Sequence, residues 1–124
     1  MLSQYPIRCT IPATDLARAK KFYTETLGFK ALSEDPEDVR LVSGGVEFDV
    51  YPTRTGGGAA TIAAWEVDDL QAEMKDLRNR GIKFEEYDLP GIKTVDGVAE
   101  MGEFKGAWFK DSEGNILSVT ELRR

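Results

Sequence analysis

Two carboxylates and a phenol alternate along one short stretch of the chain. Glu47, Asp49 and Tyr51 stand at every second position of VEFDVYPT, residues 46–53. Every second side chain of a β-strand points to the same face, so a strand here would present all three groups together. A carboxylate can act as a general base and a phenol as a proton donor. The stretch therefore indicates either acid–base chemistry or the binding of a polar ligand.

Other nucleophilic chemistry is poorly supplied. The sequence contains no histidine and a single cysteine, Cys9, so no imidazole is available to activate the thiol. One cysteine excludes an intramolecular disulfide and fits a reducing compartment, which predicts a cytoplasmic location. Cys9 lies in an alternating apolar run, and we interpret it as a small buried hydrophobe.

Charge and hydropathy exclude two further classes of function. The net charge of -6 disfavours the basic face that a phosphate backbone requires, although a local patch could survive a negative average, so we expect no nucleic-acid partner. No apolar run approaches the roughly eighteen residues of a membrane span, and the first ten residues lack the pattern of a signal peptide. We expect no membrane partner.

The first half of the chain predicts a β-α-β-β-β unit over residues 5–53. YPIRCTIPA alternates and predicts a strand with Ile7, Cys9, Ile11 and Ala13 on one face and Arg8, Thr10 and Pro12 on the other. Thr14 or Asp15 can cap the following helix, and Gly28 can end it. Three strand-like runs then follow, FKALSE, DVRLVSG and VEFDVYPT.

The same unit is then written a second time. DLARAKKFYTETLGFK, residues 15–30, returns as DLQAEMKDLRNRGIK, residues 69–83, after a glycine-rich linker at residues 54–60. The second unit, residues 61–122, predicts the strands TIAAWEV, IKFEEYDL, EFKGAWFKD and NILSVTEL around a helix capped by Asp68 or Asp69. The segment 90–102 is expected to be a loop or irregular edge, acting either as a mobile lid or as a passive connection. Neither unit can cover its sheet alone, which predicts a single domain over residues 1–124.

Two motifs at opposite ends of the chain resemble those of a known family. TDLARAKKFYTETLGF, residues 14–29, resembles the first-helix signature of the vicinal oxygen chelate superfamily, which includes glyoxalase I, extradiol dioxygenases and bleomycin resistance proteins. FKDSEGNILSV, residues 109–119, resembles the last turn and strand of that family, with Ser112 and Glu113 as mild departures. The resemblance covers essentially the whole chain. It implies an α+β fold of two βαβββ modules whose mixed sheet curves around a cleft, commonly in a homodimer.

The resemblance also locates where such proteins hold a divalent metal. Alignment on the two Asp-Leu helices and the final turn places the four ligand positions at Arg8, Asp49, Ile62 and Ser118. Only Asp49 is an ordinary ligand, because arginine has no lone pair to offer and a catalytic transition-metal site needs about three protein ligands. The resemblance therefore implies a member without a metal or other cofactor. A one-residue shift in register would offer Glu47, Glu66 and Glu121, and an oxygen-only Mg²⁺ site is the alternative.

Parity along the strands then names the side chains that would line the cleft. Trp65 and Phe109 lie on the faces of their strands that point away from the cleft, and both are expected in the core. An exposed Trp108 could stack on a flat ligand or could merely fill space. Arg8 and Asp49 could form a neutralising ion pair, or Arg8 could bind a carboxylate or phenolate of the ligand. The candidate ligand-binding residues are Arg8, Thr10, Asp49, Tyr51, Ile62, Trp108, Ile116 and Ser118.

Four functions follow from this interpretation. The first is a protein that binds or sequesters a small aromatic molecule, as the bleomycin resistance branch does. The second is a metal-independent isomerase, cyclase or lyase with Asp49 or Glu47 as general base and Tyr51 as proton donor, although Arg8 would weaken Asp49 as a base. The ligand count disfavours the third, a metal-dependent glyoxalase or dioxygenase. The fourth is an interaction module without a small-molecule role, and the sequence favours the first.

Overall fold

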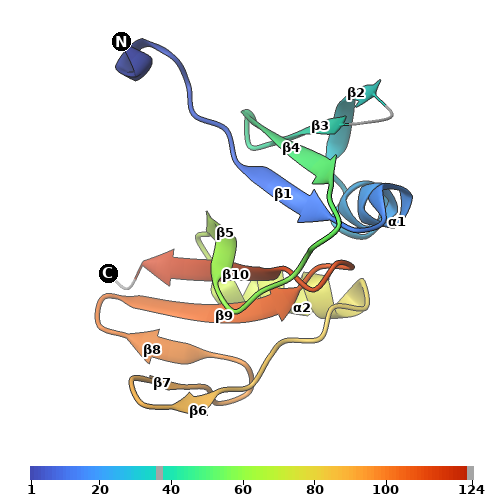
Figure 1. Cartoon of the computed structure of the whole chain (residues 1–124). Coiled ribbons are helices and arrows are strands. Elements are labelled where there is room, and N and C mark those ends of the chain that lie inside the picture. Colours follow the sequence, from blue (N-terminus) through green and yellow to red (C-terminus); the bar gives the residue numbers. More distant parts are fainter. Residues whose placement is uncertain (36–37, 123–124) are drawn as a thin grey trace. The chain divides into compact units, whose positions relative to one another are not determined.

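The chain divides into two compact units, residues 1–56 and 57–124. The computed structural model describes residues 1–35 and 38–122. Each unit combines a helix with a four-stranded mixed sheet (Figure 1), so the α+β class is confirmed. The boundary between the units falls inside the expected linker at residues 54–60. The single domain and the cleft stay predictions.

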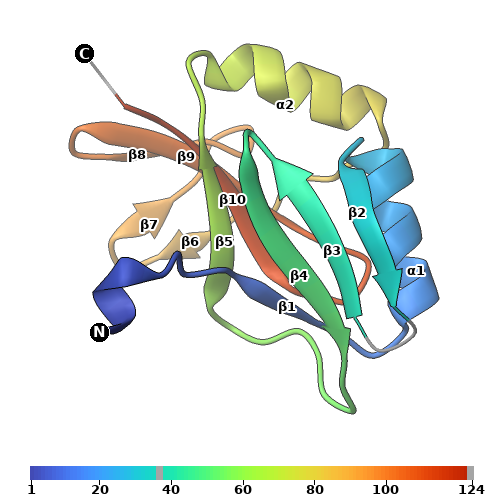
Figure 2. The same cartoon turned by 90° about the horizontal axis from the view of Figure 1, so that it is seen from above.

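The first unit follows the expected order of elements. Its sheet has the strand order β1-β4-β3-β2, in which β1 and β4 are parallel and the other neighbours are antiparallel (Figure 2). A short 3-10 helix at Leu2–Gln4 precedes these elements. The elements that follow this helix in the first unit are β1 (Thr10–Ala13), α1 (Leu16–Lys21), a π-helical turn (Phe22–Thr26), β2 (Lys30–Asp35), β3 (Asp38–Ser43) and β4 (Val46–Pro52).

Local signals determine where α1 begins and ends. The Asp15 side chain accepts a hydrogen bond from the backbone N–H of Arg18 at 3.0 Å, which satisfies one of the free donors of the first turn. The helix widens into the π-helical turn, where the N–H of Leu27 bonds to the carbonyl of Phe22. Gly28 then takes a left-handed φ of 79° and ends it. The predicted helix is therefore confirmed, with a π-helical second half.

The packing of α1 fixes which face of the first sheet is covered. Tyr23 is fully buried and lies edge-on against Phe48 of β4, with ring centroids 6.1 Å apart. Side chains alternate along a strand, so Asp49, the next residue of β4, points to the opposite face. That face of the first sheet carries the polar residues that are candidates for ligand binding.

The start of the first strand differs from the prediction. Ile11 and Ala13 are buried as expected, but Ile7 is 94% exposed and Cys9 is exposed as well. The strand begins only at Thr10, and α1 lies beside its C-terminal end (Figure 1). Cys9 therefore precedes the strand and is exposed, so the interpretation of Cys9 as a buried hydrophobe is wrong.

The second unit repeats the strand arrangement of the first. Its main sheet has the order β5-β10-β9-β8, with β5 and β10 parallel and the other neighbours antiparallel, and β6 and β7 form a separate hairpin. Its elements are β5 (Thr61–Glu66), α2 (Leu70–Asn79), β6 (Asp88–Leu89), β7 (Ile92–Lys93), β8 (Ala99–Met101), β9 (Phe104–Lys110) and β10 (Ile116–Leu122).

The edge of the second sheet is the main correction to the predicted elements. IKFEEYDL was expected to be a strand, but it contributes one isolated bridge, from Phe84 to Phe109, and the two residues of β6. The edge strand is instead β8, which lies in the segment 90–102 and pairs with β9. Pro90 and Gly91 turn the chain back between β6 and β7 before it can run along β9. The irregular edge, one of the two alternatives for this segment, is what forms.

The core of the second unit lies between α2 and one face of its sheet. Leu70 and Met74 of α2 are fully buried. Phe109 is 1% exposed and stacks on Trp65 with centroids 6.4 Å apart, so the core placement of Phe109 is confirmed, whereas Trp65 is only half-buried. The cap is Asp69, which accepts from the N–H of Ala72 at 3.0 Å. Neither α2 nor any other described helix has the length and apolar character of a membrane span.

Candidate functional site

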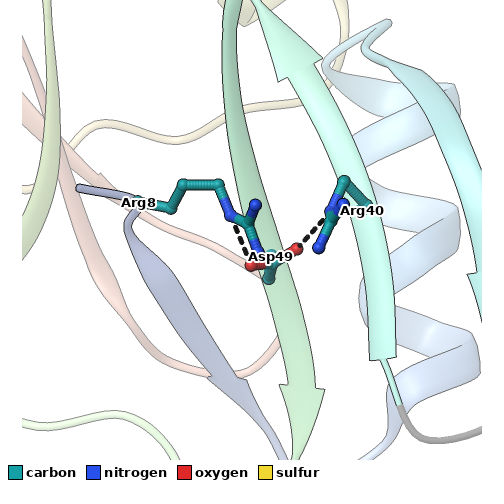
Figure 3. Close-up of polar contacts among 3 residues, drawn as sticks. All are labelled: Arg8, Arg40 and Asp49. Carbon is teal, nitrogen blue, oxygen red and sulfur yellow. Dashed lines mark hydrogen bonds and ion pairs between the residues drawn. The ribbon is translucent and has the colours of Figure 1, made fainter. Parts of the chain in front are cut away.

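One buried carboxylate of the first unit is held between two arginines (Figure 3). Arg8 Nε donates to Asp49 Oδ2 at 3.0 Å, and Arg40 Nε donates to Asp49 Oδ1 at 3.2 Å. The Asp49 side chain is 7% exposed, whereas those of Arg8 and Arg40 are 38% and 37% exposed. The arrangement, which we call the charged triad, therefore presents two partly open guanidinium groups around an enclosed anion.

Strand register brings the members of the charged triad together. Asp49 of β4 is paired with Thr10 of β1 on one side and with Arg40 of β3 on the other. Paired residues of neighbouring strands share a face, and Arg8 stands two residues before Thr10. All three side chains thus lie on the face opposite Tyr23. The expected meeting of Arg8 with Asp49 is observed as an ion pair.

Arg40 was missed by the sequence interpretation. Val39 and Leu41 are 3% and 0% exposed, and this alternation alone would have put Arg40 on the same face as Asp49. Alternation does not show that Arg40 is paired with Asp49, because the register of β3 against β4 depends on the Gly44-Gly45 turn. The missing information was therefore the register.

The charged triad is better suited to holding an anion than a metal ion. Both carboxylate oxygens of Asp49 are engaged by cationic donors, and two guanidinium groups would repel a divalent ion. Within residues 1–35 and 38–122, no group of three or more His, Cys, Asp or Glu side chains is placed to hold a metal. The chemistry available at the triad is charge-assisted hydrogen bonding.

The remaining candidates of the first unit lie around the charged triad. Thr10 and Glu47 are exposed, and Tyr51 is 38% exposed. Tyr51 pairs with Pro12 of β1, which places it on the triad face beyond Asp49. The structure thus brings Arg8, Thr10, Glu47, Asp49 and Tyr51 to one face of the sheet.

The candidates of the second unit gather on the face of its sheet that points away from Phe109. Ser118 is paired with Trp108 on one side and with Ala64 on the other, and Ile116 stands two residues before it. Ile62 of β5 lies beside the register irregularity between β5 and β10. Trp108, Ser118, Ile116 and Ile62 therefore share one region of the sheet.

Trp108 is less open than the sequence suggested. Its indole was expected to be exposed, but the residue is 8% exposed. The reason is the path of residues 82–89, which run beside Trp108. The backbone N–H of Glu85 in this segment donates a hydrogen bond to the carbonyl of Trp108 in β9 at 2.8 Å. Tyr87 then lies edge-on to the indole, with centroids 5.6 Å apart and planes at 79°.

Tyr87 is a second residue that the sequence interpretation missed. Its backbone N–H donates to Thr94 Oγ1 at 2.7 Å, and its carbonyl accepts from the N–H of Thr94 at 2.9 Å. Two causes raise the pKa of the Tyr87 phenol above its ordinary value of 10.0. The larger is desolvation by burial and the smaller is repulsion from Glu85. The phenol is therefore a neutral hydrogen-bond donor near pH 7. The sequence interpretation missed Tyr87 because it predicted a continuous strand over IKFEEYDL, whereas the chain leaves β9 before it reaches Tyr87.

The thiol of Cys9 is poorly suited to act as a nucleophile. Partial burial of its thiol raises the pKa above the ordinary value of 9.0, although the residue as a whole is exposed. A raised pKa lowers the fraction of reactive thiolate. The expectation that Cys9 has no nucleophilic role is consistent with this direction.

Comparison with known proteins gives the family and the fold. The sequence model of the glyoxalase/bleomycin resistance protein/dioxygenase superfamily matches residues 6–119. A glyoxalase/bleomycin resistance protein/dioxygenase from Nocardioides is similar in structure, with a TM-score of 0.70 at 17% identity over 97% of this chain and 85% of that chain. TnmS3, an antibiotic binding protein from a Streptomyces species, has a TM-score of 0.66 at 20% identity over 95% and 96%.

A further similar structure carries a metal. FosX, a fosfomycin resistance protein from Listeria monocytogenes in complex with Mn(II), has a TM-score of 0.66 at 11% identity over 93% of this chain and 87% of that chain. At these identities the likenesses show the fold alone. No curated protein sequence matches the chain.

Proposed function

Because this chain belongs to the glyoxalase/bleomycin resistance protein/dioxygenase superfamily, we propose that it binds or sequesters a small aromatic molecule without the help of a metal ion. Each unit by itself offers residues proposed for ligand binding, on the polar face of the first sheet and on the Trp108 face of the second. They are Arg8, Thr10, Asp49 and Tyr51 in the first unit and Ile62, Trp108, Ile116 and Ser118 in the second.

The charged triad is the observation that carries this proposal. Of the four positions that the family resemblance assigns to metal ligands, only Asp49 has a suitable side chain, and its two oxygens already accept hydrogen bonds from Arg8 and Arg40. A transition ion would have to displace two cations to reach one carboxylate. Recognition by hydrogen bonds and ring contacts needs no such displacement.

The aromatic part of the proposal rests on Trp108 and Tyr87. Their edge-to-face contact leaves a tyrosine ring and an indole next to the small side chain of Ser118. Ligand sites commonly combine such aromatic walls with a few polar groups, and aromatic pairs favour further rings in offset or edge-on contact. TnmS3, whose name describes antibiotic binding, shows that a protein of this fold can bind a small molecule.

The alternative is a metal-independent isomerase, cyclase or lyase. The charged triad disfavours Asp49 as the general base, because neither of its oxygens is left without a cationic donor. Glu47 and Tyr51 are open to water, and a solvated carboxylate is a weak base. Catalysis would be recognised by turnover that disappears in Asp49→Asn while the affinity for substrate persists.

A ligand screen tests the proposed function. We expect a compound from a set of aromatic natural products and carboxylated metabolites to raise the melting temperature in the presence of EDTA, since binding to the folded state stabilises it. The ligand should be recovered unchanged after denaturation. Trp108→Phe should weaken binding of the hit, whereas Trp65→Phe, which alters a core ring, should not. A screen without any hit, or hits only with added metal, would contradict the proposal.

The proposal extends to the state and place of the protein. We propose a cytoplasmic homodimer, supported by the family resemblance and by the single cysteine, which suits a reducing compartment. Light scattering after size-exclusion chromatography should give twice the 13.8 kDa mass of the chain. A mass equal to that of one chain at micromolar concentration would contradict the dimer.

A further inference from the structure

We propose that the ligand of this protein carries an anionic group, and that Arg8 and Arg40 bind that group together. This inference rests on the proposed function and names the class of its ligand. The class is an aromatic compound with a carboxylate or phosphoryl group. The step beyond the sequence is Arg40, since a single arginine paired with Asp49 would only neutralise it.

The first argument concerns hydrogen-bond donors. A guanidinium group has five N–H donors in a fixed planar arrangement. Among the residues whose side chains the structure describes, which leaves out residues 34–38, the contacts of Arg8 and Arg40 use the Nε–H of each and go to Asp49. The terminal nitrogen atoms therefore keep donors for another acceptor, and side chains 38% and 37% exposed give a solute access to them.

The second argument concerns charge. Two arginines and one aspartate leave one positive charge in a chain whose net charge is -6. Glu47 shares this face, but it is exposed and makes no ion pair with either arginine among the described residues. A structural brace would need only one cation for one carboxylate. The charged triad therefore carries one more positive charge than Asp49 neutralises, and this charge favours the binding of an anion.

The third argument comes from the second unit, which builds the same sheet without a charged triad. Ser118 is paired with Trp108 and Ala64 as Asp49 is paired with Arg40 and Thr10. The strand order and the directions of the strands agree in the two sheets. This topology therefore forms without ions at the central row, so the fold does not require the triad.

Asp49 has a distinct part in this arrangement, because it orders the two arginines. Arginine side chains lose rotamer entropy when they are fixed. Asp49 binds one guanidinium on each oxygen (Figure 3), so that part of this loss is met before the ligand arrives. We therefore assign Asp49 as a positioning residue and the two arginines as the ligand contacts.

The experiment compares three small probes that differ mainly in charge. Binding of benzoate, phenylphosphonate and neutral benzamide is measured by ligand-observed NMR titration in EDTA. We expect at least one anion to bind about tenfold more tightly than benzamide, because charge-assisted hydrogen bonds are the stronger ones. Preference for benzoate would indicate a planar acid, and preference for phenylphosphonate a tetrahedral one. Added NaCl should weaken binding of the anion and leave benzamide unchanged.

Variants locate the effect on the charged triad. Arg40→Met should reduce the affinity for the anion about tenfold and leave that for benzamide unchanged. Arg80→Met is the matched control, because Arg80 Nε also contacts an aspartate, Asp76, at 3.2 Å on the surface of α2. Should Arg40→Met fail to fold, Arg40→Lys keeps the charge without the planar fork and is expected to lose part of the preference.

Each outcome decides between the two levels of the proposal. If benzamide binds as tightly as both anions, or if Arg40→Met and Arg40→Lys keep the full preference, the anion inference is wrong while the proposed function stands. If none of the probes binds and the aromatic screen also fails, the proposed function is wrong as well. A preference that disappears equally in Arg80→Met would show a nonspecific charge effect and would overturn the inference.

Discussion

The two units of this protein build the same sheet and differ in what they place at its centre. In both, a parallel pair of strands is followed in the sheet by two antiparallel neighbours, and an Asp-Leu helix follows the first strand in the chain. The central row reads Thr10, Asp49 and Arg40 in the first unit and Ala64, Ser118 and Trp108 in the second. One unit thus offers charge and the other an aromatic ring.

The comparison shows which residues the fold needs and which are free to serve function. The caps are shared, because Asp15 and Asp69 both accept from a backbone N–H three residues on at 3.0 Å. The buried faces are shared in kind, with Tyr23 against Phe48 and Phe109 against Trp65. The opposite faces follow no common pattern, so their side chains are the ones to test for ligand binding.

The largest expected effect concerns a turn that differs between the units. Gly44 and Gly45 join β3 to β4, whereas the turn between β9 and β10 holds a buried network in which Asn115 donates to Asp111 Oδ2 at 2.8 Å and accepts from Gly57 N–H at 3.1 Å. Asn115→Ala removes both of these side-chain hydrogen bonds from a buried residue and should lower the free energy of unfolding by about 3 kcal/mol. Urea unfolding measures this, and the exposed Asn79→Ala is the control. A loss no greater than that of the control would contradict the role of the network.

The second prediction sets the two central rows against each other. Asp49→Asn leaves two neighbouring cations without their counter-ion, for which we expect a loss of about 2 kcal/mol, less than for a fully buried pair because both arginines are partly exposed. Ser118→Ala should cost less than about 1 kcal/mol, since it removes one hydroxyl oxygen and leaves the methyl group of alanine in its place. Equal losses in thermal unfolding would show that the rows do not differ in this way.

The third prediction concerns a feature that the units share. Asp15→Ala and Asp69→Ala each remove one N-cap hydrogen bond and should lower stability by about 1 kcal/mol. Circular dichroism during urea unfolding gives both values. A cap whose removal costs nothing would show that its helix is held by packing alone.

The smallest effect is a pH dependence specific to the second unit. The pKa of Tyr87 is raised in the folded protein above 10.0, so the folded state holds this proton more tightly than the unfolded state does. Its contribution to stability is therefore complete below pH 10 and is lost as the pH rises through the folded pKa. Tyr87→Phe should flatten the decline of stability above pH 10, and Tyr51→Phe is the matched control. An identical decline in wild type and Tyr87→Phe would contradict the shift.

Much of this fold could be predicted because its signals are local. Asp15, Asp69, Gly28 and Gly81 mark the ends of the two helices through their own side chains or backbone angles. Alternation gave β1, β4, β5, β9 and β10 their faces, including that of the buried Phe109. β8 escaped prediction because three residues are too few to alternate, and its pairing with β9 is a long-range contact.

The candidate site was predictable only in part, for the same reason. The meeting of Arg8 with Asp49 followed from aligning the chain with a family motif, and the structure shows it. Arg40 and Tyr87 reach their positions through strand register and through the path of a loop, which neighbouring residues in the sequence do not determine. Their contribution therefore emerged only from the arrangement in space.

The central claim is that this protein recognises its ligand without a metal ion, and metal content tests it most directly. The protein is loaded with Mn²⁺, Ni²⁺, Zn²⁺ or Mg²⁺, dialysed and measured by elemental analysis. We predict that far less than one equivalent of any of these metals stays with the chain and that EDTA leaves ligand binding unchanged. About one equivalent retained per chain, lost in Asp49→Asn and needed for binding, would contradict the account.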